Sequence, residues 1–143
     1  MLNDKLSLTG ALTISLNGEV VRDINNLVVT VGKALVASRL ASNSAAVIGY
    51  MAVGTGTTAA AAGNTTLGTE IDRNALAVSG GTATGAVVSY TTTWAPGDGT
   101  GALTEAGLFN ASSSGVMLCR TVFPVVNKGA DDTVTIVWDV TIS

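Results

Sequence analysis

The chain has 143 residues, with 10 acidic and 7 basic side chains, a net charge of −3 and no histidine. Its basic residues are scattered, which excludes the clustered positive footprint of nucleic-acid-binding proteins and the polybasic tract of membrane-surface proteins. The absence of histidine excludes the common catalytic triads and the common zinc sites. Charged residues make up only 12% of the chain. That is about half the usual share, and such a surface suits packing against other protein chains.

The length fits a single domain over residues 1–143, large enough to bury a core without disulfides or metals. Cys119 is the only cysteine, which excludes an intramolecular disulfide, favours a reducing compartment and predicts a small buried side chain on a strand. Residues 1–10 lack the pattern of a signal peptide, and no apolar run approaches the ~20 residues that cross a bilayer. We expect a soluble chain made in the cytoplasm, with residues 1–5 as a flexible N-terminal arm that becomes ordered on a partner.

The first half of the chain predicts a hairpin, a helix and a buried strand. Residues 8–16 alternate apolar and polar side chains, an Asn-Gly pair favours a type I′ turn, and residues 19–24 return as the second strand. Residues 30–41 have the spacing of a helix, which we expect to pack across one end or face of a sheet. Residues 46–53 follow as a mostly buried strand.

The second half predicts only strands and turns. The strands are expected at residues 74–78, 86–94, 103–109, 116–122 and 133–142. Pro124 is expected to end the fourth of them, and the last has an entirely apolar face from Val134 to Ile142. Many short strands without a βαβ rhythm predict an all-β, mainly antiparallel fold. We expect a jelly-roll-like β-sandwich with one inserted α-helix at about residues 30–41.

One long segment, residues 54–73, separates two predicted strands. It is rich in glycine, alanine and threonine and carries no charge until Glu70. Its Gly-Thr-Gly start has a faint likeness to a phosphate-binding loop, but a P-loop needs a Gly-Lys-Ser/Thr sequence and this segment has no lysine. A connection this long is usually functional or disordered. We predict that it lies against a neighbouring subunit and becomes ordered there.

Paired carboxylates are the remaining enzymatic option, with Glu70 next to Asp72 and Asp131 next to Asp132 in the sequence. A glycosidase needs two carboxylates that face each other across a cleft, and sequence spacing does not show that arrangement. Asp98 lies in a glycine-rich loop but lacks the other spaced oxygen ligands of a calcium loop. We therefore predict no catalytic residue, no cofactor-binding residue and no metal site.

Four charged residues lie within or beside otherwise apolar, strand-like sequence. Because burying a lone charge is costly, such residues should be paired. We predict structural ion pairs among Glu70, Arg73, Glu105 and Arg120, with Glu105 bound either to Arg120 or to Arg73. The alternative is that each side chain points into solvent from an outer strand face.

Five motifs stand out over the later part of the chain. They are VGTGTT at 53–58, LGTEIDR at 67–73, LTEAGLF at 103–109, MLCRTVF at 117–123 and NK at 127–128. Followed by an alternating strand with a tryptophan, this combination resembles a group of small structural proteins of tailed bacteriophages. The resemblance covers roughly residues 27–143. Members of the group include capsid cement, or decoration, proteins with a jelly-roll-like fold, and related segments resemble parts of tail fibre and baseplate proteins.

The resemblance implies a non-enzymatic virion protein, assembled in the host bacterial cytoplasm, that binds the exterior of the phage head and clamps neighbouring major capsid subunits. Its implied partners are the major capsid protein and itself, as a dimer or trimer at capsid symmetry positions. No nucleic acid, membrane or cofactor is expected. The alternative is a small tail, baseplate or fibre-attachment protein that binds a host surface ligand. Tyr90 and Trp94 then either line a sugar-binding face or, as their place on a strand favours, are core or interface aromatic residues.

Subunit contacts are predicted in three segments: the start of the chain, the long segment and the loop at residues 96–101. The residues are Met1, Leu2, Asn3, Ala60, Ala61, Thr66, Leu67, Pro96 and Asp98. The alternative is that each segment is an ordinary surface loop.

Overall fold

The computed structural model describes residues 5–42 and 45–143. In chain order the elements are β1 (Leu8–Leu16), β2 (Glu19–Val28), α1 (Thr30–Leu40), β3 (Tyr50–Gly54), β4 (Glu70–Ala75), β5 (Thr82–Thr84), β6 (Val87–Trp94), β7 (Gly101–Phe109), β8 (Met117–Lys128) and β9 (Val134–Ile142). They confirm the predicted all-β class with one inserted helix. No helix in the described part of the chain is long and apolar enough to cross a membrane.

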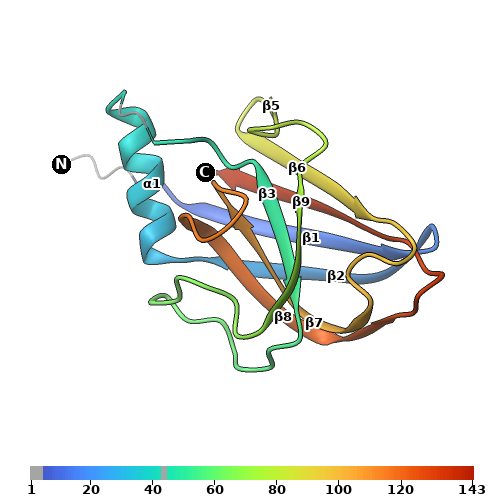
Figure 1. The fold of residues 1–143 in the computed structure, drawn as a ribbon. Coiled ribbons are helices and arrows are strands. Elements are labelled where there is room, and N and C mark those ends of the chain that lie inside the picture. The colour runs from blue at the N-terminus through green and yellow to red at the C-terminus, as the bar shows by residue number, and fades with distance from the viewer. Residues whose placement is uncertain (1–4, 43–44) are drawn as a thin grey trace.

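The strands form one antiparallel sheet in the order β4-β3-β7-β8-β2-β1-β9-β6-β5. The sheet curls so that its two halves face each other as the layers of a sandwich (Figure 1). The far margins of the sheet meet again, since Thr92 on β6 donates its hydroxyl to the Ala75 carbonyl at 2.8 Å. The amide of Ala77 donates to the Thr91 carbonyl at 2.9 Å. The core is therefore enclosed on this side as well.

Strand β2 connects the two layers. It pairs with β1 along most of its length, but only Leu27 and Val28 pair with β8. Elsewhere β2 and β8 separate, and the guanidinium of Arg22 spans the gap. Its Nε donates to the Pro124 carbonyl at 2.9 Å and its Nη2 to the Val125 carbonyl at 2.7 Å.

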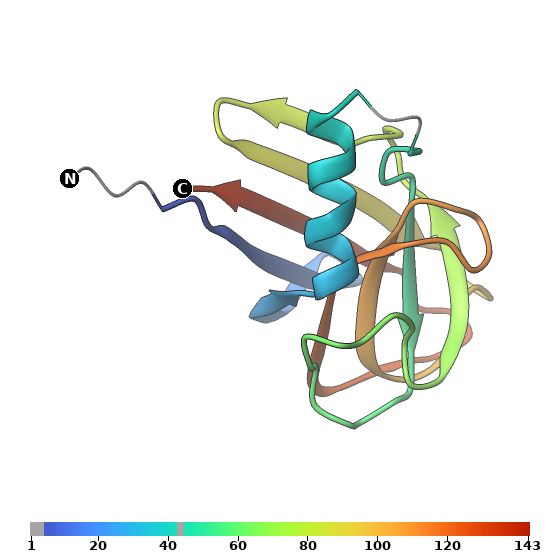
Figure 2. The same ribbon diagram turned by 90° about the vertical axis from the view of Figure 1, so that its left-hand side faces the viewer.

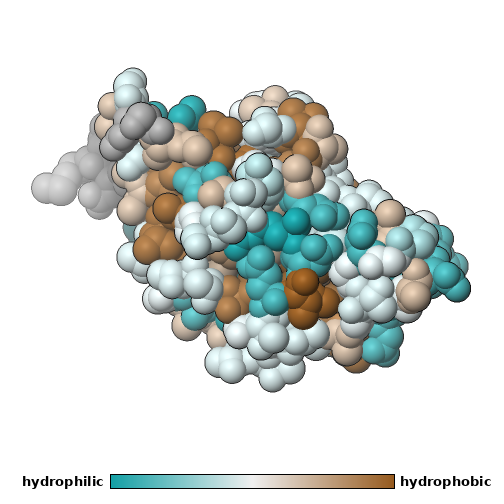
Figure 3. Space-filling view, in the orientation of Figure 1, coloured by the Kyte–Doolittle hydropathy of each residue, from teal (hydrophilic) through white to brown (hydrophobic). Residues whose placement is uncertain are grey.

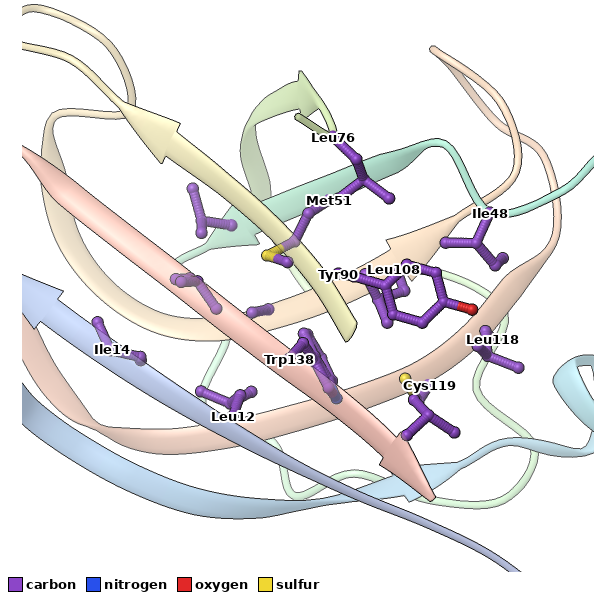
Figure 4. Packing of buried hydrophobic residues seen from close by; sticks show 14 of the residues in the cluster. Leu12, Ile14, Ile48, Met51, Leu76, Tyr90, Leu108, Leu118, Cys119 and Trp138 are labelled. Carbon is purple, nitrogen blue, oxygen red and sulfur yellow. The ribbon is translucent and has the colours of Figure 1, made fainter. Parts of the chain in front are cut away.

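Large apolar side chains from both layers fill the space between them. Trp138 and Tyr90 come from one layer, and Met51 and Leu108 from the other (Figure 4). Cys119 belongs to the same cluster and is fully buried, as its position in the sequence predicts. Burial raises the pKa of its thiol, so this cysteine stays protonated and acts as a small apolar side chain.

Helix α1 stands across one end of the sandwich, close to the predicted range (Figure 2). Gly32 and Leu35 are its buried residues, and the rest of its surface faces outward or is partly covered. Gly32 lies so close to β8 that a Cβ there would overlap the Leu118 carbonyl oxygen. Glycine at this position therefore lets the helix backbone approach the strand.

Several predicted strand boundaries are wrong: β2 extends to Val28 and not only to residue 24, and β5 is not among the predicted strands. The strand predicted at 46–53 begins only at Tyr50, and the one predicted at 74–78 is β4, which begins at Glu70. Pro124 does not end β8, which continues to Lys128. The register with β7 shifts at this point, so Pro124 falls in an irregular stretch of the strand pair. No hydrogen bond between the strands is lost there because proline lacks an N–H.

Replacing Gly32 by alanine tests the packing of α1 on β8. Helix propensity alone would make this change stabilising by up to ~1 kcal/mol. The overlap with the Leu118 carbonyl should outweigh that gain, because overpacking a close contact costs about 1–3 kcal/mol. We expect Gly32→Ala to lower the free energy of unfolding measured by chemical denaturation, whereas Ala34→Gly, on the exposed side, loses only the ~1 kcal/mol of propensity. A higher midpoint for Gly32→Ala would contradict the close contact.

Candidate functional site

The β3–β4 loop, residues 55–69, is the most distinctive surface segment of the described structure. It contains no charged residue and consists almost entirely of threonine, alanine and glycine. In Figure 1 it extends from the lower end of β3 towards α1. There the amide of Thr30 donates to the Ala62 carbonyl at 2.8 Å. The loop therefore spans the distance from the end of β3 to the start of the helix.

The side chain of Glu105 on β7 holds the two ends of this loop together. Its Oε2 accepts hydrogen bonds from the amide of Gly56 at 2.6 Å and from the amide of Thr69 at 2.8 Å. Its Oε1 accepts from the amide of Gly68 at 2.7 Å. The carboxylate is completely buried, so the start and the end of the loop close over it.

Arg120 on β8 pairs with Glu105 and extends the attachment to the middle of the loop. Its Nη2 lies 3.0 Å from Glu105 Oε1 and 3.0 Å from the Thr58 carbonyl oxygen. Its Nη1 donates to Asn64 Oδ1 at 3.0 Å. Both charged side chains are buried, so they do not point into solvent as the alternative prediction had it. Of the two partners predicted for Glu105, the structure selects Arg120.

The glycines at the start of the loop are explained by this carboxylate. A Cβ at Gly56 would overlap Glu105 Oε2, and a Cβ at Gly54 would overlap the Thr69 carbonyl oxygen. Backbone amides that converge on one point form an anion-binding hollow. The loop therefore shares with a phosphate-binding loop the backbone amides that converge on an anion. The anion bound here is the carboxylate of Glu105.

A second ion pair fixes the strand that follows the loop. Arg73 Nη2 lies 2.7 Å from Glu70 Oε1. Its Nη1 donates to the carbonyl oxygens of Ala111 and Ser114 at 2.9 Å each, and its guanidinium lies 3.8 Å from the centre of the Phe109 ring. Arg73 thus joins β4 to the β7–β8 turn.

The hydrogen bonds around Glu105 also determine its protonation. Burial alone would raise the pKa of this carboxyl, but the donors from Thr69, Gly68, Arg120 and Gly56 outweigh burial and hold the pKa below its ordinary value of 4.5. The group is charged at neutral pH, enclosed and already occupied by donors. Its chemical role is to anchor the loop.

The structure leaves four of the predicted subunit contacts exposed: Ala61, Thr66, Pro96 and Asp98. Ala60 is half-buried. Leu67 is wrong as a contact, because it is only 5% exposed and packs under the loop with Phe109 and Met117. The remaining three, Met1, Leu2 and Asn3, lie outside the described residues.

Of the two interpretations of Tyr90 and Trp94, a ligand-binding face and core aromatic residues on a strand, the structure selects the second. Both rings point into the core, where Tyr90 is 7% exposed and Trp94 is completely buried. Burial, with a smaller contribution from the nearby Cys119, raises the pKa of Tyr90 to about 12. These aromatic residues stabilise the sandwich and do not offer a surface to a ligand.

The sequence did not predict the groups of the loop that bind the ion pair. Gly68 and Thr69 donate to the carboxylate, and Asn64 binds Arg120 from within the loop. The available signal was the recurrence of glycine at both ends of the segment, beside a charged residue on a distant strand. Only the fold shows that those glycines surround that charge.

Comparisons with protein-family models, with curated proteins and with solved structures found no match. Within residues 5–42 and 45–143, no group of three or more His, Cys, Asp or Glu side chains is placed to hold a metal ion. The site consists of the buried ion pair of Glu105 and Arg120 and, over it, a loop of small uncharged residues.

Replacing Glu105 by glutamine tests the anchor. The change keeps the shape but leaves Arg120 as an unpaired buried charge, a situation that costs about 3–5 kcal/mol. We expect that loss in the free energy of unfolding, together with faster proteolytic cleavage within residues 55–69 under native conditions. The control is Glu70→Gln, which breaks a pair whose carboxylate is 34% exposed, and should cost about 1 kcal/mol or less. Equal effects of the two variants would contradict the anchor.

The same carboxylate should make the loop sensitive to acid. Its pKa is lower in the folded than in the unfolded chain, so its stabilising effect is complete above the ordinary value of 4.5 and disappears as the pH falls through the lowered value. We therefore expect the difference in unfolding free energy between the wild type and Glu105→Gln to shrink as the pH is lowered from about 6 to about 2. A difference that stays constant over this range would show that folding does not lower the pKa of this carboxyl, and a difference that grows towards acid would show that its pKa is raised.

Proposed function

We propose that this chain is a non-enzymatic structural protein of a phage virion, a capsid cement or decoration protein that binds the outer surface of the head and clamps neighbouring major capsid subunits. The observation that carries the proposal is the fastening of an uncharged, small-residue loop to a rigid sheet by the buried pair of Glu105 and Arg120. The loop is already held in place within the single chain, so the prediction that it becomes ordered on a neighbouring subunit is wrong. A contact loop that is ordered before binding loses less conformational entropy when it docks.

The composition of the loop supports a protein surface as its target. Alanine, glycine and threonine have few rotamers to lose and let two backbones come close together. Charged residues are depleted in the centres of protein interfaces, and residues 55–69 have none. A protein that binds the assembled shell but not its separate subunits stabilises the shell by mass action. This is the physical basis of a clamp.

A tail or baseplate protein could use the same loop, so the first experiment must separate the two locations. We expect the particle to contain this protein at a copy number comparable to that of the major capsid subunit, measured by quantitative mass spectrometry. Particles that lack the protein should release their genome at a lower temperature and keep intact tails. Full heat resistance of such particles, combined with loss of adsorption to the host, would reject the cement function and indicate a tail location.

The loop itself is tested by a charged substitution on its exposed surface. We expect Ala61→Arg to reduce binding to heads that lack the protein by at least about tenfold, because a guanidinium in the contact would have to be desolvated. The readout is co-sedimentation of purified protein with the heads. The matched control is Thr84→Arg on β5, which is also exposed but lies at the other margin of the sheet. Equal binding of both variants would exclude the loop as the contact surface.

A further inference from the structure

The two ends of the sandwich carry opposite charges, and one of them contains a hollow. Strand β1 joins them, with Leu8 beside α1 and Leu16 beside the β1–β2 turn. Eight steps of ~3.3 Å along an extended strand separate these residues by roughly 26 Å. Figure 1 shows α1 at one end and the β1–β2 turn at the other. A surface at one end therefore cannot contact the surface at the other end of the same molecule.

The α1 end contains an apolar groove. It has a volume of about 400 Å³ and lies between α1 and the start of β1, where Leu6, Leu8, Val36 and Leu40 line it. Leu6 is 75% exposed and Leu40 is 79% exposed, so both leave apolar surface in contact with solvent. Figure 3 shows apolar surface gathered over the position of α1. This end of the molecule presents unburied apolar surface around a hollow.

The α1 end is positively charged, and of its charged side chains Lys33 lines this groove, whereas Arg39 lines a separate hollow. Residues 5–7 and α1 together carry three charged side chains, Lys5, Lys33 and Arg39, and all three are exposed. Lys33 lines the groove directly. Arg39 lies on the same helix and donates to the Ala45 carbonyl at 2.8 Å. An occupant with matching chemistry would combine an apolar side chain with a neighbouring carboxylate.

The opposite end is negative. The β1–β2 turn and the β8–β9 loop join there, since Asn17 Nδ2 donates to Asp132 Oδ1 at 2.9 Å. Exposed carboxylates at this end belong to Glu19, Asp98 and Asp131. Lys128 also lies here, but it is buried and donates to the Ala95 carbonyl. Arg22, three residues after Glu19, is half-buried and is bound to the carbonyl oxygens of Pro124 and Val125. The carboxylates outnumber it, so the net charge of this end is negative.

The tip of the β1–β2 hairpin has the chemistry that the groove requires. Val20 is 63% exposed and follows directly after the exposed Glu19. The tip is a tight turn, with Asn17 and Gly18 both at positive φ, and it is held against the β8–β9 loop by the Asn17 amide and side chain. The hairpin tip is therefore a rigid turn that carries an apolar side chain next to a carboxylate.

We propose that copies of this chain associate head to tail, with the β1–β2 hairpin tip of one copy seated in the α1 groove of the next. Val20 enters the hollow between Leu6 and Leu40, and the Glu19 carboxylate pairs with the Lys33 ammonium. Because the two contact surfaces are different, such an association is heterologous and either closes into a ring or continues as a filament. The inference concerns contacts between copies and does not depend on the phage head.

Two variants that each disable one surface provide the test. Val20→Asp disrupts the contact surface of the hairpin tip and leaves the groove intact. Leu40→Asp disrupts the apolar groove and leaves the hairpin tip intact. The side chains are mostly exposed, so both variants should keep the unfolding midpoint of the wild type. In sedimentation velocity, we expect the mass of the wild type to rise above 14.2 kDa with concentration, and each variant alone to stay monomeric. An equimolar mixture should form a 1:1 dimer and stop there, since it has one intact tip and one intact groove.

The charge pair is tested in the same assay by Glu19→Lys and Lys33→Glu. Each alone should fail to associate because like charges meet, whereas the mixture should associate again, with reduced affinity at high salt. Val137→Asp, on the exposed side of β9, is the matched control and should associate as the wild type does. A wild type that stays monomeric at every concentration would overturn the proposal. So would a mixture of Val20→Asp and Leu40→Asp that stays monomeric, or a Leu40→Asp variant that still self-associates.

Discussion

The buried pair of Glu105 and Arg120 is the interaction on which the organisation of the functional surface depends. Between them the two side chains make five hydrogen bonds to the β3–β4 loop, three through the carboxylate and two through the guanidinium. A buried ion pair is weak evidence for net stability, because desolvation offsets most of the attraction. This pair holds the β3–β4 loop in one conformation, although the loop has little apolar surface of its own to bury. Leu67 is the one side chain of the loop that is buried in the core.

The sequence predicts the fold class well because alternation along the strands is dictated by burial. The strand from Val134 to Ile142 and the hairpin around Asn17 and Gly18 lie where the pattern places them. The helix is found within one residue of its predicted range. These elements depend on neighbours in the sequence and on a generic apolar core. The structure adds the order of the strands and the closure of the sheet, which depend on contacts between distant segments.

The candidate site is only half visible in the sequence, for a physical reason. Charges within apolar strands must be compensated, and this predicts that Glu105 has a partner. The choice between Arg120 and Arg73 depends on register, because β7 pairs with β8 so that Gly107 lies opposite Arg120 and Glu105 opposite Val122. The donors from the loop backbone have no sequence signature beyond glycine. Leu67 was misplaced on the surface because a loop of small residues has no alternating pattern that shows which side chain turns into the core. Tyr90 and Trp94 lie in the core, the interpretation that their place on a strand favours.

The separation of β2 from β8 has a consequence for how the protein behaves in a crowded solution. Two strand edges that diverge would normally leave rows of free N–H and C=O groups, which are templates for pairing with strands of other molecules. In this chain Pro124 has no N–H to offer, and Arg22 already binds the carbonyl oxygens of Pro124 and Val125. The guanidinium also places a positive charge at this opening. The exposed edge is thus protected against non-native β-pairing at the place where the sheet is least continuous.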